Sequence, residues 1–195
     1  MCKKYRIGID AGGTKVAYGL FDADGQLLDR MQHPSDINAD GPAFSDRMIE
    51  TIREIEKKHN LKNEDLQGIG ICMPSYILFD TGYVYLTSAL TNIRDFPMKE
   101  YLQERLPGVK IVLDNDSNAA ALAEYRKGAG RGSRHMIYMA TSTGIGSGII
   151  IDGKLFRGSY GWAGECGHML ATPDEGIMCG CRNCISASQT FPQSC

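Results

Sequence analysis

The spacing of hydrophobic residues along the opening part of the chain predicts short strands followed by a helix. Three short runs rich in apolar and β-branched residues are separated by a Gly/Thr loop and an Asp-Gly turn, a pattern typical of strands joined by tight connections. The strands are expected at residues 7–10, 16–21 and 27–31. An amphipathic helix is expected over 43–59, because apolar residues from Phe44 to Ile55 recur at helical spacing.

Strands and helices alternate from there to about residue 128. Apolar runs of strand length are followed by stretches of helix-forming residues, and Pro or Gly stands at several of the boundaries. The expected elements are a strand at 68–74, a hairpin or extended loop at 75–92, a helix at 97–106, a strand at 110–116 and an Ala-rich helix at 117–128. The core elements therefore follow the order βββαβαβα.

The opening order of strand, loop, strand, turn and strand occurs twice. Residues Ile7–Arg30 read IGIDAGGTKVAYGLFDADGQLLDR, and residues Met139–Gly158 read MATSTGIGSGIIIDGKLFRG. The second copy begins at Met136, and completing it would take roughly 60–100 further residues. We therefore expect an α/β fold of two lobes, residues 1–128 and 129–195, with an incomplete second lobe in a C-terminally shortened chain.

The two Gly/Thr loops of this repeat are candidates for holding a polyphosphate. A strand that ends in such a loop exposes backbone N–H groups, glycines let an anion approach them, and a Thr hydroxyl adds a donor. Asp10 at the strand end can hold Mg²⁺ directly or through water, and Lys15 adds positive charge. The alternative is that both loops are only tight turns. The residues expected to bind the nucleotide are Asp10, Gly12, Gly13, Thr14 and Lys15 in the first loop and Thr143, Gly144 and Gly146 in the second.

Composition and charge narrow the class of protein. Of 195 residues, 43% are hydrophobic and 23% are charged, which is ordinary for a globular protein, and the net charge of -2 gives no basic field for nucleic acid. No apolar run approaches the ~20 residues that span a bilayer, and no secretory segment precedes the first strand, so we expect a cytoplasmic protein. Three of the seven cysteines gather in CGCRNC, which favours metal or redox chemistry over disulfides.

Four segments together resemble the ROK family of bacterial sugar kinases and sugar-responsive repressors. They read GIDAGGTK, DNDSNAAALAE, TSTGIGSGIIIDGKLFRG and GWAGECGHM, and the likeness runs in order over residues 5–184. The chain is also similar to the kinase half of the bifunctional enzyme that phosphorylates N-acetylmannosamine. The resemblance implies the two-lobed actin/hexokinase-like fold, a ribonuclease H-like ATPase architecture, which agrees with the repeat.

The resemblance also implies an ATP- and Mg²⁺-dependent hexose kinase that phosphorylates a sugar hydroxyl, such as the 6-hydroxyl of glucose or of an N-acetylhexosamine. This reaction needs alignment, charge neutralisation and an acceptor for the hydroxyl proton. Asp116, after a strand and at a helix start, matches the family's catalytic base, and a carboxylate there is stabilised in its charged form. The alternative is that Asp116 or Ser117 only caps the Ala-rich helix.

Further sugar contacts are implied by the same resemblance. Asn115 matches a ligand of the sugar hydroxyls, and Asn92 in TNI matches the Asn of the family's PNL stretch more loosely. Glu165 and His168 in GECGH match the pair that binds the upper hydroxyls of the ring, although such a pair also occurs in plain surface turns. Ser75 stands where the family more often has Gly.

At the cysteine cluster, the resemblance also implies a metal site. The family has a zinc site made by the His of GH and three Cys of CxCGxxGC, and a Cys₃His set suits structural Zn²⁺. The ligands implied here are His168, Cys179, Cys181 and Cys184, with a last gap two residues shorter than in the family. The alternatives are incidental free thiols or a damaged site.

Two other functions remain open at this point. A sugar-sensing regulator of the ROK type would carry a DNA-binding helix-turn-helix ahead of the first strand, and only about four residues precede it here, so we expect no nucleic-acid partner. An inactive remnant would retain sugar binding without the adenosine-binding part of the second lobe. The partners expected are a hexose and ATP, without a membrane, and a homodimer is left open.

Overall fold

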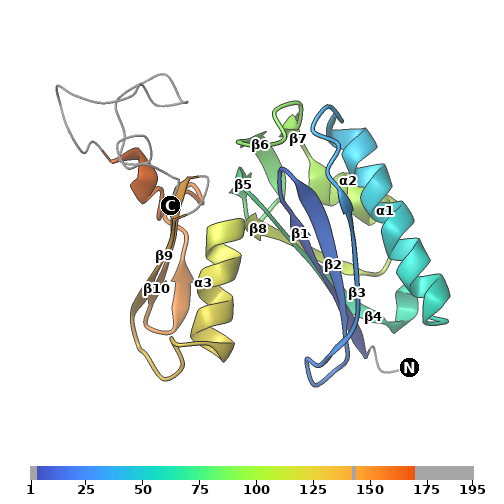
Figure 1. Ribbon diagram of the computed structural model, residues 1–195, viewed down its shortest axis with the longest axis horizontal. Helices are drawn as coiled ribbons and strands as arrows, with labels where there is room; N and C mark the ends of the chain where they lie inside the picture. The colour runs from blue at the N-terminus through green and yellow to red at the C-terminus, as the bar shows by residue number, and fades with distance from the viewer. Residues whose placement is uncertain (1–3, 142–143, 170–195) are drawn as a thin grey trace. The chain divides into compact units, whose positions relative to one another are not determined.

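The computed structural model describes residues 4–141 and 144–169, which fall into two compact units (Figure 1). The first unit ends at Asp116 and the second begins at Ser117. The lobe boundary that we expect at residue 128 stays a prediction. Within the two described stretches, no helix is long and apolar enough to cross a membrane.

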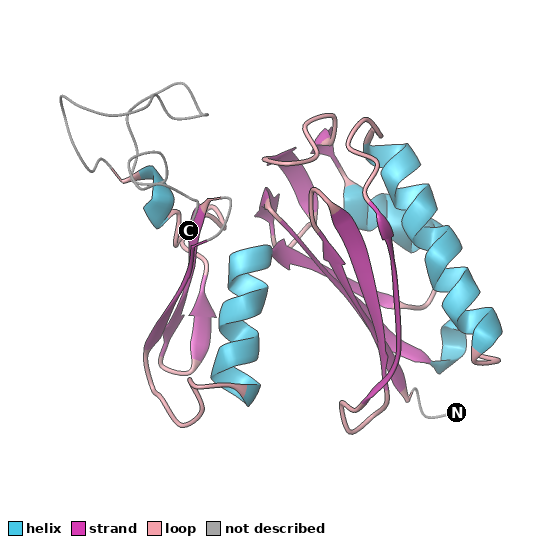
Figure 2. Ribbon diagram, viewed as in Figure 1, coloured by secondary structure: helices cyan, strands magenta, loops and turns pink. Residues whose placement is uncertain are grey.

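A five-stranded sheet forms the centre of the first unit, in the order β3-β2-β1-β4-β8 (Figure 2). Its strands are β1 (Tyr5–Ala11), β2 (Lys15–Phe21), β3 (Leu27–Pro34), β4 (Leu66–Met73) and β8 (Lys110–Asn115). β2 is antiparallel to β1 and β3, whereas β4 is parallel to β1 and to β8. All five strands confirm predicted ones. Because β1, β4 and β8 run in the same direction, their carboxyl ends meet at one edge of the sheet.

One face of this sheet packs against α1 (Gly41–Lys58) and α2 (Met98–Arg105), as Figure 1 shows. Helix α1 begins where the carboxylate of Asp40 accepts a hydrogen bond from Ala43 N at 2.9 Å, which satisfies an amide that the first turn leaves unpaired. The predicted amphipathic helix is confirmed by its buried stripe of Phe44, Met48, Ile52 and Ile55. Burial stabilises the fold by about 1.5–3 kcal/mol for each such side chain.

Alternation along the strands separates core residues from polar ones. Ile9 and Ala11 of β1 are buried, whereas Asp10 between them is exposed on the other face. In β4, Ile71 is buried, and the next residue, Cys72, is only partly buried and pairs with Asp10. The face opposite the helices therefore carries Asp10 and Cys72, whose side chains can bind a ligand or take part in a reaction.

A second, three-stranded sheet, β5-β6-β7, is inserted between β4 and α2. It consists of the antiparallel strands β5 (Ser75–Leu78), β6 (Tyr83–Thr87) and β7 (Arg94–Phe96). β5 and β6 confirm the hairpin expected within residues 75–92. β7 was not predicted, because a three-residue strand that begins with two charges has no apolar alternation, and it forms by pairing with β6.

The second unit packs a helix on a three-stranded sheet, and both are drawn in Figure 2. The helix is α3 (Asp116–Lys127), and the strands are β9 (Met136–Thr141), β10 (Ile145–Ile151) and β11 (Lys154–Phe156). A Cβ placed on Gly148 of β10 would lie 2.5 Å from Ala121 Cβ of α3, so only glycine lets the helix approach the strand this closely. These elements confirm the predicted Ala-rich helix and the second copy of the repeat.

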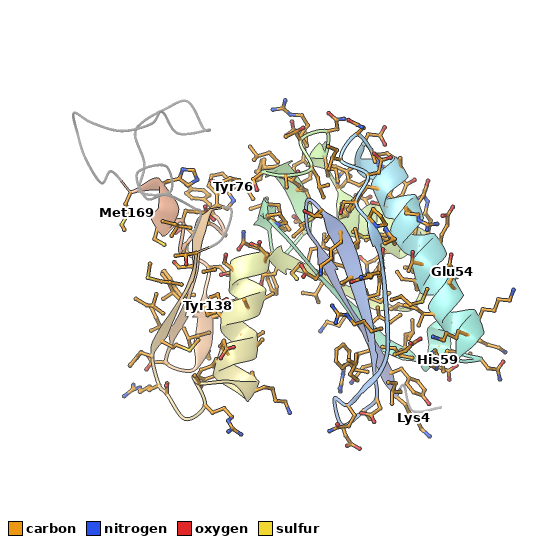
Figure 3. All side chains as sticks on the ribbon, viewed as in Figure 1. Lys4, Glu54, His59, Tyr76, Tyr138 and Met169 are labelled. Atoms are coloured by element: carbon orange, nitrogen blue, oxygen red, sulfur yellow. The ribbon has the colours of Figure 1, made fainter. Side chains whose placement is uncertain are left out.

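Asp29 of β3 joins the large sheet to the C-terminal end of α1, where His59 is labelled in Figure 3. Its carboxylate lies 2.8 Å from both Lys58 Nζ and His59 Nε2. Hydrogen bonds from these two side chains lower the pKa of Asp29 from 3.8 to about 2. Since its pKa is depressed on folding, the carboxylate stabilises the protein fully above the unfolded value, and that stability is lost as the pH falls toward 2.

We predict that Asp29→Asn lowers the free energy of unfolding by roughly 1 kcal/mol at pH 7, the upper range for a partly exposed ion pair. The difference between wild type and variant should shrink as the pH falls from about 4 to 2. Urea denaturation at several pH values measures it. Asp24→Asn, in the neighbouring exposed turn, is the control that removes an equal charge, and equal effects of both variants would contradict the proposed ion pair.

The sheet of the second unit also carries exposed apolar side chains, since Ile137 is 68% and Met139 is 59% exposed on β9. Such a surface promotes association. We predict that the double variant Ile137→Thr, Met139→Thr reduces concentration-dependent association, measured by light scattering. Leu27→Thr with Leu28→Thr is the control and should reduce association less, because these exposed neighbours on β3 point to opposite faces of the strand, whereas Ile137 and Met139 share one face. A wild-type chain that stays monodisperse at all concentrations would contradict the prediction.

Candidate active site

The loop between β1 and β2 leaves two consecutive backbone N–H groups without acceptors. Gly12 N donates to Lys15 O at 3.0 Å, which closes the turn. The amides of Gly13 and Thr14 donate to no acceptor in the part of the chain that the structure describes, and Thr14 and Lys15 are exposed. Successive N–H groups of this kind form a concavity that binds anions, so the loop has the donors that a phosphate group requires.

Acidic side chains converge beside this loop, at the edge where β1, β4 and β8 end. Asp10 pairs with Cys72 across the sheet, and Cys72 pairs with Asp114. Cys72 Sγ donates to Asp10 Oδ1 at 3.8 Å. Burial and the negative charges of Asp10, Asp116 and Asp114 raise the pKa of Cys72 to about 12, so the thiol stays neutral among the carboxylates.

Asn115 and Asp116 lie at the junction of β8 and α3. Asn115 N donates to Asp114 Oδ1 at 2.9 Å, and its side-chain Nδ2 donates to Ser75 O at 3.2 Å. Ser75 is buried, and its hydroxyl donates to Met73 O at 2.9 Å, so the chain accommodates a serine here without strain. The structure thus brings Asp10, Asn115 and Asp116 together around the carboxyl ends of parallel strands.

Asn92 lies apart from this cluster in the chain, on the exposed loop between β6 and β7. Its side-chain Nδ2 donates to Asn38 O at 2.8 Å, in the connection between β3 and α1. This hydrogen bond holds the loop of Asn92 against the connection between β3 and α1. Its role in binding sugar stays a prediction.

In the second unit, Gly144 and Gly146 differ in what surrounds them, and Thr143 lies outside the described residues. Among the described residues, a Cβ on Gly144 would have no heavy atom within 4 Å, whereas a Cβ on Gly146 would collide with Ser117 Oγ. Gly146 therefore allows α3 to approach β10, and Gly144 leaves open space at the start of the strand.

Glu165 directly precedes a short 3₁₀ turn, Cys166–His168, which ends with His168 and lies against β10. Glu165 Oε2 and His168 Nε2 are 3.9 Å apart, and the side chains are 36% and 40% exposed. Ser147 Oγ of β10 donates to Gly164 O at 2.7 Å, just before this segment. A Cβ on Gly164 would collide with Ser147 O, and one on Gly167 would collide with Ile145 O. The glycines of the GECGH motif are thus required for the segment to reach the strand.

The donors that the structure places suit a hydrated Mg²⁺ ion better than a closed metal site. Within residues 4–141 and 144–169, no three His, Cys, Asp or Glu side chains are grouped so as to hold a metal ion. Mg²⁺ needs no such cage, because it usually keeps several waters and takes one or two carboxylates together with substrate phosphates. The carboxylates of Asp10 and Asp116 fit that mode. The zinc site stays a prediction, since Cys179, Cys181 and Cys184 lie outside the described residues.

The place of Cys72 among the carboxylates was not predicted from the sequence. A signal was present, because Asp10, Cys72 and Asp114 are each the last residue but one of β1, β4 and β8. Equivalent positions on neighbouring parallel strands face the same side of a sheet. Finding this signal required the strand ends to be known to the residue, and sequence patterns do not determine them that closely.

Comparison with known proteins places these observations in a family. The sequence matches the ROK family over residues 6–188. It is 35% identical over 185 residues to a glucokinase of Halalkalibacterium halodurans, covering 93% of this chain and 54% of the relative. It is 35% identical over 182 residues to the xylose repressor of Bacillus subtilis, covering 92% of this chain and 45% of the relative. The chain therefore spans about half the length of the curated relatives that it matches.

The structure is similar to that of a ROK family glucokinase from Streptomyces griseus, solved with glucose and AMPPNP. The TM-score is 0.76 at 34% sequence identity, over 95% of this chain and 55% of the other. The likeness confirms the predicted α/β, actin/hexokinase-like fold. Since the family match covers nearly all of the sequence and the fold agrees with it, this chain belongs to the ROK family.

Proposed function

We propose that the chain carries sugar- and phosphate-binding machinery of an ATP-dependent hexose kinase. The observation that supports this most directly is the pair of unused N–H groups on Gly13 and Thr14, next to the carboxylate of Asp10. Backbone donors and an acid at one strand end are suited to a phosphate chain that carries Mg²⁺. The sequence relatives named glucokinase and N-acetylmannosamine kinase support a hexose as acceptor.

In the proposed reaction, a sugar hydroxyl attacks the γ-phosphorus of ATP. The new O–P bond forms as the bond from the γ-phosphorus to the bridging oxygen breaks, and ADP leaves with the electron pair. Asp116 accepts the hydroxyl proton, which suits a carboxylate at the first position of a helix, where the helix dipole favours the charged form. Asn115 and Asn92 donate to or accept from the other sugar hydroxyls.

Asp10, with or without intervening water, would hold Mg²⁺, which neutralises charge on the phosphates when bound. The amides of Gly13 and Thr14 and the charge of Lys15 would orient the phosphate chain. In the second unit, the absence of a side chain at Gly144 would let phosphate approach the backbone of that loop. Glu165 and His168 would bind the upper hydroxyls of the sugar ring. Their separation of 3.9 Å allows both to contact neighbouring hydroxyls of one sugar.

A sugar-binding regulator is the second candidate, supported by the likeness to the xylose repressor of Bacillus subtilis. Such a protein would bind sugar without turnover. A coupled assay for ADP over glucose, mannose, N-acetylglucosamine and N-acetylmannosamine separates the two functions. We would assay this chain and a chimera in which the remainder of the Halalkalibacterium halodurans glucokinase follows residue 188. Sugar binding by calorimetry without turnover in either protein would contradict the kinase proposal.

We predict that Asp116→Asn lowers kcat by a factor of about 10² to 10⁴ and changes sugar affinity by less than about tenfold, since it removes the proton acceptor and keeps the shape. The measurements are steady-state kinetics in the active chimera and calorimetric titration of glucose in both proteins. The thermal midpoint of the variant serves as the control for folding. Unimpaired turnover would remove Asp116 from the role of base.

We predict that Gly144→Val weakens binding of Mg²⁺-ATP while glucose binding and the thermal midpoint stay unchanged. A Cβ at Gly144 meets no atom within 4 Å in residues 4–141 and 144–169, so a loss of affinity would reflect exclusion of the ligand. Gly13→Val should also weaken Mg²⁺-ATP, but with lower stability, because its Cβ would lie 2.7 Å from Ala89 Cβ. Undiminished ATP affinity in the Gly144 variant would exclude this loop from phosphate binding.

A further inference from the structure

A short connection, residues 35–40, joins β3 to α1 (Figure 1). One serine ties this connection to the loop between β1 and β2, residues 12–14, which we call the phosphate loop. Ser35 N donates to Thr14 O at 3.0 Å, and Ser35 Oγ donates to Gly12 O at 2.6 Å. The two acceptors are the carbonyls on either side of Gly13. Both donor groups of Ser35, its backbone N–H and its hydroxyl, are therefore bonded to the loop.

These bonds matter because the loop has little else to fix its shape. Gly12 and Gly13 have no side chains, and glycine has the greatest backbone freedom of any residue. A carbonyl that accepts a hydrogen bond fixes the plane of its peptide, and that plane includes the following N–H group. The Ser35–Gly12 bond thus sets the direction of the Gly13 amide, and the Ser35–Thr14 bond fixes the peptide between Thr14 and Lys15. The Gly13–Thr14 peptide is held between these two.

The rest of the connection has anchors of its own. Asp36 Oδ1 accepts from Asn38 N at 3.0 Å, Asn38 O accepts from Asn92, and Asp40 caps α1. Packing contributes less, because a cavity of about 340 Å³ lies against Pro34, Asp36 and Ala39. Hydrogen bonds, more than side-chain packing, hold the connection, and at its Ser35 end they all go to the phosphate loop.

We propose that Ser35 is a positioning residue that orients the Gly13 amide toward the phosphate chain. The inference rests on the proposed function, in that it requires the β1–β2 loop to bind phosphate. Ser35 does not touch the nucleotide and acts through Gly12 and Thr14. Loss of its hydroxyl frees the peptide between Gly12 and Gly13 and leaves the rest of the connection in place.

The test compares Ser35→Ala and Ser35→Thr with wild type. The probes are Mg²⁺-tripolyphosphate, which uses only phosphate contacts, and Mg²⁺-ATP, both titrated by calorimetry. Ser35→Ala should weaken both ligands about three- to tenfold, the effect of one hydrogen bond, whereas Ser35→Thr keeps the hydroxyl and should stay within about twofold. Hydrogen exchange should rise in residues 11–15 of Ser35→Ala and stay unchanged in residues 36–44.

Ser45→Ala is the matched control, because Ser45 Oγ also donates to a glycine carbonyl, Gly41 O, at 2.8 Å, but inside α1. It should leave phosphate affinity and exchange in residues 11–15 unchanged. If the wild-type protein binds neither probe, the proposed phosphate-binding role of the loop is overturned, and the inference about Ser35 is overturned with it. Wild type that binds tripolyphosphate, with equal affinity and equal loop exchange in Ser35→Ala, would overturn the role of Ser35 alone. A lower thermal midpoint with weakened glucose binding in Ser35→Ala would show a general structural role and overturn it too.

Discussion

The pairing of β1 with an antiparallel strand on one side and a parallel strand on the other determines most of the first unit. The antiparallel neighbour, β2, forces a tight loop at the carboxyl end of β1. The parallel neighbour, β4, brings its own carboxyl end to the same edge and sets Cys72 beside Asp10. A glycine loop and a group of acids therefore meet at one place because of how a single strand is paired.

The acids at this edge repel one another, and the structure limits that repulsion with a neutral residue. Cys72 occupies the row between Asp10 and Asp114, and burial together with their charges raises its pKa. A carboxylate in its place would add a like charge to the row. A side chain that remains uncharged adds no further negative charge beside Asp10 and Asp114.

The two copies of the hairpin motif are supported in different ways. In the first, a serine beyond β3 bonds the carbonyls of the loop itself. In the second, Ser147 lies on β10 and bonds the carbonyl of Gly164, which precedes the 3₁₀ turn of Glu165 and His168. The same strand order thus positions a loop in one unit and a following segment in the other. In both cases a serine hydroxyl and a backbone carbonyl make the link, because glycine-rich segments offer few side chains for packing.

The sequence by itself determined the order of the main strands and helices, the repeat and the family. These follow from local apolar spacing and from short motifs, and the long, strongly patterned elements such as α1 were predicted nearly to their ends. Only the tertiary structure decided that Cys72 lies among the carboxylates, that β7 pairs with β6, and that Ser35 is bonded to the loop between β1 and β2. Each of these depends on which residues of distant segments are brought into register, and hydrogen bonds between such segments leave no period or spacing in the chain.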